Sequence, residues 1–313
     1  MKPPARLYKF RPFNDHVLDM LLFDRLFYSD PSTFNDPLDT KPSLKCDIST
    51  EELERVLGTL VEQRTRAELM AAAKTIKYSG PKTLDHIELQ SRKRSQRVIE
   101  DIRYHATNPE YGSADPEQFL LAHSIEEELL RRFDKGIVSF ATRDVCPLMW
   151  SHYGDQHKGI CVGYSVRDEA QQSLYKVKYG HARAVTARDV EAMLSGNDAA
   201  RRRVDEAVFV RKAAAWRYEH EWRLIGHRGL QDSPLELEEV VFGLRCSDTV
   251  KFTVVSALAK RTRPLSLFEV FHQNGSFELR KRELETTDFG TYFPRRVHDA
   301  MEAFSEIVLP ADA

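Results

Sequence analysis

A block of long helical patterns separates two regions of short strand patterns, and this arrangement limits the folds open to the chain. The helical patterns are rich in charge, carry little strand signal and cover residues 51–74, 83–106 and 116–133. An amphipathic helix must bury its apolar stripe against another element. We therefore expect these helices to pack on one another as an insertion, and the strands on either side to build the rest of the fold.

Strand-like alternation and helix-like spacing fill the flanking regions. Strand patterns occur at residues 7–10, 26–29, 137–141, 159–164, 173–179, 221–225, 237–243, 266–271 and 277–280. Shorter helical patterns occur at residues 15–25, 187–194, 198–215 and 247–261. This order predicts an α+β protein with a split, mixed or antiparallel β-sheet core. The expected parts are an N-terminal part of the core (1–45), a largely helical insertion (46–133), the remainder of the core (134–285) and a C-terminal helical tail (286–313).

Charge and composition exclude several classes of protein. The 313 residues carry 46 Lys and Arg against 48 Asp and Glu, a formal net charge of −2, which excludes a uniformly basic nucleic-acid coat and an acidic disordered chain. No window reaches the roughly 18 uninterrupted apolar residues of a membrane-spanning helix, and the N-terminus lacks the apolar segment of a signal peptide. Four widely spaced cysteines without a C-x-x-C pair fit reduced thiols. We expect a cytoplasmic protein that does not contact a membrane.

The most basic run of the chain, residues 91–97, lies in the second long helical pattern. Four cations of this run are candidates for contact with the phosphates of a nucleic acid, namely Arg92, Lys93, Arg94 and Arg97. The alternative is a solvated helix face whose charge is balanced by Glu88, Glu100 and Asp101. Charge runs on helices are usually of this second kind.

The densest set of chemically able side chains lies at residues 148–159, where eight of twelve side chains can donate or accept a hydrogen bond. The segment leads directly into the apolar strand pattern at 159–164. Polar turns held by a buried strand are where rigid scaffolds present sites. We therefore expect a substrate-binding turn made by Trp150, Ser151, His152, Tyr153 and His157. In the alternative, Trp150 and Tyr153 are core aromatics and the two histidines cap the turn.

The side chains in and around this turn also suggest two other kinds of site, a metal site and a nucleophile with its base. Cys146, His152, His157 and Cys161 offer four candidate zinc ligands, but their spacing matches neither a C-x-x-C knuckle nor an H-E-x-x-H helix, so no metal is expected. The second is a nucleophile at Cys146 or Ser151 with a histidine base, although neither residue lies in a recognisable nucleophile elbow. The chain also lacks G-x-x-x-x-G-K-[ST] and G-x-G-x-x-G motifs, which argues against phosphate-loop NTPases and dinucleotide dehydrogenases.

A second polar segment, residues 216–225, begins Trp-Arg-Tyr-Glu-His-Glu-Trp-Arg. If a strand starts near Glu219, period-two alternation places Glu219, Glu221 and Arg223 on one face. Carboxylates accept hydrogen bonds from ribose hydroxyls and oppose the positive charge of an oxocarbenium-like transition state. The alternative is a surface ion-pair cluster, which is common and contributes little to stability. Spacing alone favours this alternative.

Three ordered motifs run through the strand-containing regions. They are Leu-Tyr-Lys-Phe-Arg at 7–11 with Leu-Phe-Tyr-Ser-Asp-Pro-Ser-Thr-Phe-Asn-Asp-Pro at 26–37, the segment 148–163, and the segment 218–225 followed by Glu-Val-Val-Phe-Gly at 239–243. Together they closely resemble the uncharacterised bacterial family named domain of unknown function 2971. The resemblance extends from residue 7 to about residue 279 and leaves out the helical insertion.

The order of elements is similar, more distantly, to the ADP-ribosyltransferase superfamily, and this likeness implies the same split α+β sheet. It also implies that Glu221 hydrogen-bonds the nicotinamide ribose of NAD and favours the oxocarbenium-like transition state as nicotinamide leaves. Glu219, two residues earlier, is implied to orient the acceptor, as in the E-x-E pair of some members. NAD is thereby implied as a co-substrate.

The same likeness implies an NAD-binding set spread over several segments. Tyr8 takes the first position, in the opening strand, and Ser139 or Thr142 takes the second, in the middle strand. To these we add the polar turn, the Asn-Asp pair of the loop at 30–37 and the arginine that shares a face with the carboxylates. The expected set is Tyr8, Lys9, Arg11, Asn35, Asp36, Ser139, Trp150, Ser151, His152, Tyr153, His157 and Arg223.

Three functions are open to the chain. The first is an NAD-dependent transferase that moves ADP-ribose to a macromolecular acceptor, protein or nucleic acid, in bacterial defence or stress, with Glu221 and Glu219 as catalytic residues. The second is a nucleic-acid- or protein-binding module without catalysis, in which the basic run contacts phosphates. The third is a metal-assisted hydrolase that uses His152 and His157.

Overall fold

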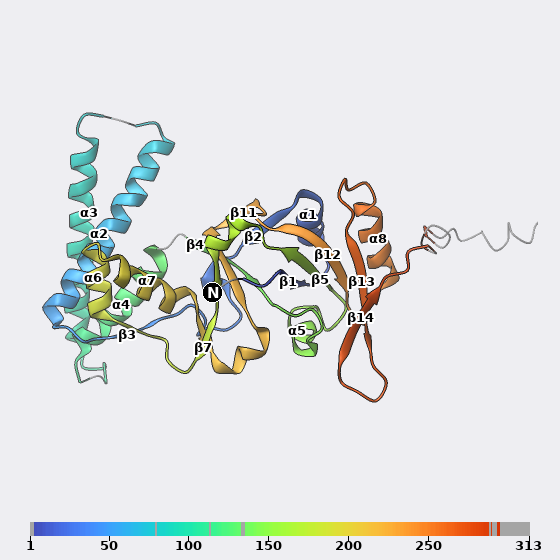
Figure 1. The fold of residues 1–313 in the computed structure, drawn as a ribbon. Coiled ribbons are helices and arrows are strands. Elements are labelled where there is room, and N and C mark those ends of the chain that lie inside the picture. The colour runs from blue at the N-terminus through green and yellow to red at the C-terminus, as the bar shows by residue number, and fades with distance from the viewer. Residues whose placement is uncertain are drawn as a thin grey trace, which may run out of the picture. The chain divides into compact units, whose positions relative to one another are not determined.

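The computed structural model divides into two compact units, each assembled from separate stretches of the chain (Figure 1). It describes residues 3–78, 80–112, 114–132, 135–287, 289 and 293–294. The first unit comprises Met1–Leu26, Phe140–Gln171 and Asp232–Ala313. The second comprises Phe27–Ser139 and Gln172–Gln231. Segments that are distant in sequence therefore complete each unit.

A five-stranded sheet forms the centre of the first unit. In spatial order its strands are β1 (Arg6–Arg11), β5 (Ile160–Ser165), β12 (Glu236–Phe242), β13 (Ser266–His272) and β14 (Leu279–Glu283). The β12–β13 pair is parallel, and the other three neighbouring pairs are antiparallel. The apolar strand β5 is buried along nearly its whole length, as a strand covered on both faces must be.

The register of this sheet brings three residues from different strands into one row. Tyr8 of β1 pairs with Gly163 of β5, and Gly163 pairs in turn with Glu239 of β12. A β-carbon on Gly163 would lie 2.5 Å from Glu239 Cγ. The side chain of Glu239 therefore occupies the space that any larger residue at position 163 would need.

Capped helices flank the strands of the first unit. The helix α1 (Asp15–Phe23) begins after Asn14, whose side-chain oxygen accepts a hydrogen bond from the Val17 amide at 3.1 Å. The helix α8 (Asp248–Leu258) begins after Ser247, which accepts from the Val250 amide. The short helix α5 (Pro147–His152) has proline at its first position and buries Met149 and Trp150.

Long helices form one part of the second unit. The helices α2 (Thr50–Thr75), α3 (Thr83–Ala106) and α4 (Pro116–Arg132) follow the predicted helical patterns within one residue at each end. A capping box starts α2, because Ser49 Oγ accepts from the Glu52 amide at 3.2 Å and the Glu52 carboxylate accepts from the Ser49 amide at 2.8 Å. Figure 1 shows α2 and α3 running side by side as a hairpin.

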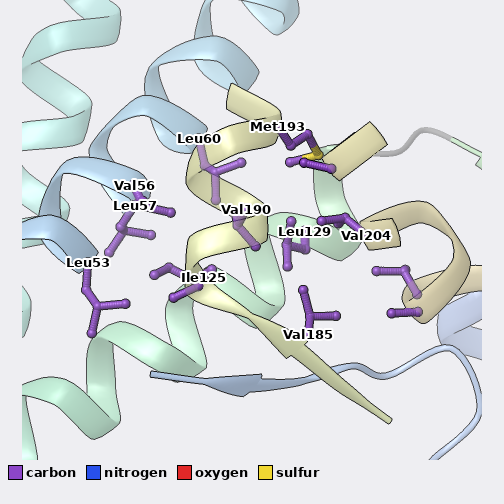
Figure 2. Close-up of a cluster of buried hydrophobic side chains, with 14 of the residues drawn as sticks. Leu53, Val56, Leu57, Leu60, Ile125, Leu129, Val185, Val190, Met193 and Val204 are labelled. Atoms are coloured by element: carbon purple, nitrogen blue, oxygen red, sulfur yellow. The ribbon is translucent and has the colours of Figure 1, made fainter. Parts of the chain in front are cut away.

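These helices share a hydrophobic core with α6 (Ala187–Leu194) and α7 (Asp198–Phe209), which come from later in the chain. Figure 2 shows buried side chains of this core from α2, α4, α6 and α7, among them Leu53, Leu57, Ile125, Leu129, Val190 and Val204. Each fully buried Leu, Ile or Val contributes roughly 1.5–3 kcal/mol relative to an exposed side chain. The helical region and the later helices therefore stabilise one another.

Short strands and 3-10 helices make up the rest of the fold. A three-stranded sheet has the order β4 (Lys135–Phe140), β10 (Trp222–His227), β6 (Leu174–Lys176). Two-stranded sheets join β3 (Ser43–Lys45) to β8 (Ala184–Thr186), β7 (Lys178–Gly180) to β9 (Arg211–Ala213), and β2 (Arg25–Tyr28) to β11 (Gly229–Asp232). The 3-10 helices are η1 (Pro31–Thr33), η2 (Asp168–Ser173) and η3 (Ala214–Glu219).

The predicted α+β class and the helical region at α2–α4 are confirmed. The pattern at 198–215 is not one helix, because α7 ends at Phe209 and β9 and η3 follow. The pattern at 173–179 is not one strand either, since it breaks between β6 and β7. No described helix is long and apolar enough to cross a membrane. Most of the expected helical tail at 286–313 lies outside the described residues, and the expected domain limits stay a prediction.

Candidate functional site

The expected site residues are divided between the two units. The first unit holds Tyr8, Lys9, Arg11, Trp150, Ser151, His152, Tyr153 and His157. The second holds Asn35, Asp36, Ser139, Glu219, Glu221 and Arg223. Each unit therefore carries its own candidate site.

In the second unit Arg223 lies at the centre of a buried ion cluster, which comprises Asp39, Lys212, Glu219, Glu221 and Arg223. The Arg223 side chain is 0% exposed. Its Nε donates to Glu221 Oε1 at 2.8 Å, and its Nη2 donates to both carboxylate oxygens of Asp39 at 2.8 and 2.7 Å. Its Nη1 donates to the carbonyl oxygen of Phe209 at 2.8 Å. A guanidinium can be buried completely only when its donors are satisfied in this way.

Lys212 is the second cation of the ion cluster. Its Nζ lies 2.6 Å from Glu219 Oε2, 3.0 Å from Glu221 Oε2 and 3.4 Å from Asp39 Oδ2. Three carboxylates thus face two cations, which leaves the ion cluster with a formal net charge of −1 (2 − 3). Because charges interact strongly in a site shielded from water, this excess favours a positively charged group nearby.

The cations keep Glu221 ionised although it is buried. Burial by itself raises the pKa of a carboxyl group. Here the charges of Arg223 and Lys212, with hydrogen bonds from Arg223 and Ser139, outweigh burial and lower the pKa of Glu221 to about 2. Glu221 is therefore a fixed negative charge at neutral pH and a poor proton acceptor.

Acid should weaken the second unit through this group. The folded pKa of Glu221 lies below its ordinary value of 4.5, so its stabilisation is complete above about pH 4.5 and is lost as the pH falls through about 2. We expect the free energy of unfolding in urea to decrease across that window, and to decrease less in Glu221→Gln. The exposed Glu110→Gln should retain the wild-type dependence. An acid dependence that is identical in Glu221→Gln and the wild type would contradict this assignment.

The loop at 30–37 meets the ion cluster at its rim. The guanidinium of Arg223 lies over the ring of Phe34, 5.6 Å from its centre. The indole Nε1 of Trp216 donates to Asp36 Oδ2 at 2.7 Å, and the same indole ring lies 5.2 Å from Lys212 Nζ. Trp216 and Asp36 are half-buried, whereas Asn35 is exposed. The structure thus brings together two of the sequence motifs, the Asn-Asp loop and the segment at 216–225.

Glu219 and Glu221 lie together for a different reason from the predicted alternation along a strand. Glu219 ends η3, and β10 begins only at Trp222, so strand alternation does not apply to Glu219 or Glu221. Between them His220 adopts a left-handed conformation with φ of 46°, which turns the chain into the strand. The surface alternative is also wrong, because Glu219 and Glu221 are 4% and 3% exposed.

In the first unit the turn that follows α5 mixes core and surface side chains. Trp150 is fully buried, and its Nε1 donates to the carbonyl oxygen of Asp144 at 2.7 Å. It is therefore a core aromatic, as the alternative predicted. Ser151 and His152 are exposed, and Tyr153 and His157 are half-buried. Among the described residues no group of three or more His, Cys, Asp or Glu side chains is placed to hold a metal ion.

Tyr8 belongs to a separate polar cluster on the five-stranded sheet. It hydrogen-bonds Glu239, and burial together with the charges of Asp144 and Glu239 raises the pKa of its phenol. Lys281 Nζ lies 2.6 Å from Asp144 Oδ2 and 3.1 Å from Glu239 Oε1. Arg6 also pairs with Glu239, at 3.2 Å. This arrangement keeps the phenol protonated, which favours a role as a hydrogen-bond donor.

The other expected residues of β1 lie apart from that cluster. Lys9 is buried, with its Nζ 5.4 Å from the centre of the Phe140 ring. Burial lowers the pKa of the Arg11 guanidinium. The backbone of Arg11 closes on Gly159, where a β-carbon would lie 2.2 Å from the Arg11 carbonyl oxygen.

Several residues that form these sites were absent from the expected set. They are Asp39 and Lys212 in the ion cluster, and Asp144, Glu239 and Lys281 in the cluster around Tyr8. Glu239 carried a signal, since it directly precedes the apolar end of its strand and begins the motif at 239–243. Asp39 carried none, because its partner Arg223 lies 184 residues away in sequence. Lys212 lies only 7 and 9 residues from Glu219 and Glu221, but its place in the predicted helix at 198–215 gave no reason to group it with them.

The basic run of α3 is presented to solvent. Its four cations are exposed, and none forms an ion pair with a described residue; they are Arg92, Lys93, Arg94 and Arg97. Glu88, one of the expected balancing carboxylates, lies 3.6 Å from Arg66 instead. Phosphate contact by this run stays a prediction.

A family model described as a protein of unknown function, DUF2971, matches residues 149–224. That stretch includes the turn after α5 and most of the ion cluster, which confirms the resemblance over those residues. No curated protein matches the chain. No solved structure matches it, so the more distant likeness to ADP-ribosyltransferases has no support from these comparisons.

Proposed function

We propose that the chain is an ADP-ribosyltransferase-like enzyme that uses NAD as co-substrate and transfers ADP-ribose to a protein or nucleic acid. The observation that carries the proposal is the buried ion cluster with its formal excess of one negative charge around Glu221. When nicotinamide leaves, positive charge develops on the ribose carbon. A fixed carboxylate in a site shielded from water stabilises such charge without having to reorganise.

The rim of the ion cluster offers groups that suit the rest of a nicotinamide ribose. Trp216 and Tyr218 are half-buried aromatic rings with centres 6.1 Å apart, and a flat heterocycle can stack on such faces. Asp36, which accepts from the Trp216 indole, and Asn35, its neighbour in sequence, have oxygen atoms able to accept hydrogen bonds from ribose hydroxyls. These contacts bind the ground state, whereas Glu221 acts on the charge that develops later.

A cavity of about 300 Å³ in the same unit suits a diphosphate. It borders the ion cluster, because Phe209, which accepts from Arg223, is part of its lining. Its lining also holds three cations, Lys41, Arg131 and Arg228, and two carboxylates, Asp30 and Glu68. Arg228 is paired with Asp30 at 2.6 Å, and a diphosphate can replace a surface carboxylate as its partner. This volume is at the lower end of the range for small-molecule sites.

The direct test is release of nicotinamide from labelled NAD by the whole protein, with and without protein and nucleic-acid acceptors. We expect release by the wild type, and a loss of about 100-fold or more in Glu221→Gln because the fixed charge is gone. The exposed Glu110→Gln is the matched control and should release at the wild-type rate. No release by the wild type with any acceptor would overturn the proposal.

A second variant separates the cleavage of NAD from the transfer of ADP-ribose. Glu219→Gln should still release nicotinamide to water but transfer less ADP-ribose to an acceptor, since Glu219 is the residue assigned to acceptor orientation. All variants are assayed well below their measured unfolding temperatures. If Glu219→Gln and Glu221→Gln lose both activities equally, the two carboxylates do not have the separate roles proposed.

A further inference from the structure

A serine and a histidine meet at the surface of the first unit. Ser151 Oγ in α5 lies 3.2 Å from His157 Nε2 in the following turn. Ser151 is exposed, so a reagent in solution can reach its hydroxyl. A serine hydroxyl is a weak nucleophile alone and becomes reactive when an adjacent imidazole accepts its proton.

The imidazole ring of His157 is held in one orientation. It stacks on the buried indole of Trp150, with centres 6.3 Å apart and planes 18° from parallel. Trp150 is itself fixed by the Asp144 carbonyl and by the edge-on ring of Phe10, 5.0 Å away. A base fixed in this way needs little rearrangement to accept the proton of Ser151.

The backbone of the turn that carries His157 is strained. Asp155, Gln156 and His157 all adopt left-handed conformations, with φ of 48°, 52° and 70°. A non-glycine residue in this region costs on the order of 1 kcal/mol or more, and such strain persists only where the surrounding structure enforces it. The His157 carbonyl accepts from the Arg245 amide at 2.9 Å, and a β-carbon on Gly243 would lie 2.2 Å from that carbonyl oxygen.

The electrostatic setting suits a base and an anionic ligand. Burial and the charge of Arg245 lower the pKa of His157, so its imidazole is neutral at pH 7 and able to accept a proton. Its Nδ1 is buried, and no described residue hydrogen-bonds it. Arg245 is exposed and brings a positive charge to the same turn, which favours a phosphoryl group over a neutral acyl group.

We propose that Ser151 and His157 form a nucleophile–base pair that reacts with an electrophilic phosphoryl centre. Ser151 Oγ forms a bond to phosphorus as the bond from phosphorus to its leaving group breaks. The hydroxyl proton passes to His157 Nε2, and the leaving group departs with the electron pair of its bond. This reaction lies in the first unit and goes beyond the proposed chemistry at Glu221.

A fluorophosphonate probe tests the pair on the full-length protein, with fluoride as the leaving group. Peptide mass spectrometry should find the phosphonyl group on Ser151, and Ser151→Ala should abolish it. The variant His157→Asn should slow labelling by about 100-fold or more, the usual contribution of a general base. Asparagine is chosen because it tolerates the left-handed conformation of position 157.

Two controls decide the result. Ser276→Ala removes another exposed serine of the first unit and should leave labelling of Ser151 unchanged. Thermal unfolding of each variant shows whether the unit is intact. The proposal is overturned if wild-type Ser151 is not labelled, or if a folded His157→Asn labels at the wild-type rate. Loss of nicotinamide release in Glu221→Gln has no bearing on this labelling, so the two proposals fail separately.

Discussion

Replacing Arg223 by methionine is expected to lower the free energy of unfolding by about 3–5 kcal/mol, the usual cost of removing one partner from a buried ion pair. The substitution leaves Asp39, Glu219 and Glu221 buried, with Lys212 as the remaining cation of the ion cluster. It also removes Arg223 Nη1, which donates a hydrogen bond to the Phe209 carbonyl oxygen at 2.8 Å. A loss of this size is a large part of the total stability of an ordinary domain.

Urea unfolding followed by circular dichroism measures this loss, and hydrogen exchange of the β10 amides locates it in the second unit. Arg217→Met is the matched control, because Arg217 is exposed in the same segment and should change stability by no more than about 0.5 kcal/mol. Asp39→Asn added to Arg223→Met should recover part of the loss by removing one of the carboxylate charges that has lost its guanidinium partner. If Arg223→Met costs less than the Arg217 control, the ion cluster contributes nothing to stability.

Gly243→Ala is the second substitution with a large expected effect. The added β-carbon would lie 2.2 Å from the His157 carbonyl oxygen and 3.0 Å from Trp150 Cζ3. Both neighbours are fixed, the first by backbone hydrogen bonding and the second by complete burial, so neither can move at low cost. We expect a loss of about 3 kcal/mol, the upper part of the usual range for overpacking.

Gly180→Ala is the control for that experiment. A β-carbon on Gly180 meets nothing within 4 Å, and its backbone is not left-handed, so alanine there should be neutral or stabilise by less than about 1 kcal/mol. Urea unfolding of the two variants compares them directly. Equal stability of Gly243→Ala and Gly180→Ala would mean that the turn at 155–157 shifts freely, contrary to the fixed geometry described for His157.

The sequence predicted those parts of the molecule that depend on local pattern. The helices α2, α3 and α4 were predicted to within one residue because their apolar spacing repeats over many turns. The paired strands β3, β8, β7 and β9 were not predicted as separate elements, since each has three residues and too few positions for alternation to show. The division into two units was not predicted, because each combines segments that no local pattern connects.

The ion cluster shows the same limit at the level of single residues. Glu219, Glu221 and Arg223 were identified because they lie together in the sequence. Asp39 lies 184 residues from Arg223, its hydrogen-bond partner, and the pair exists only once the fold is formed. One chain holds many carboxylates of similar local context, so spacing alone gives no way to choose Asp39 among them.

Because the two units are interleaved in sequence, the second unit can be completed before the first during synthesis. The last segment of the second unit ends at Gln231, whereas the first unit still requires the strands from β12 onward. On the ribosome the second unit can therefore be completed while the sheet of the first unit still has only β1 and β5. During that interval the nascent chain carries an open edge on β5, where β12 later pairs, and unpaired strand edges are prone to associate with other chains.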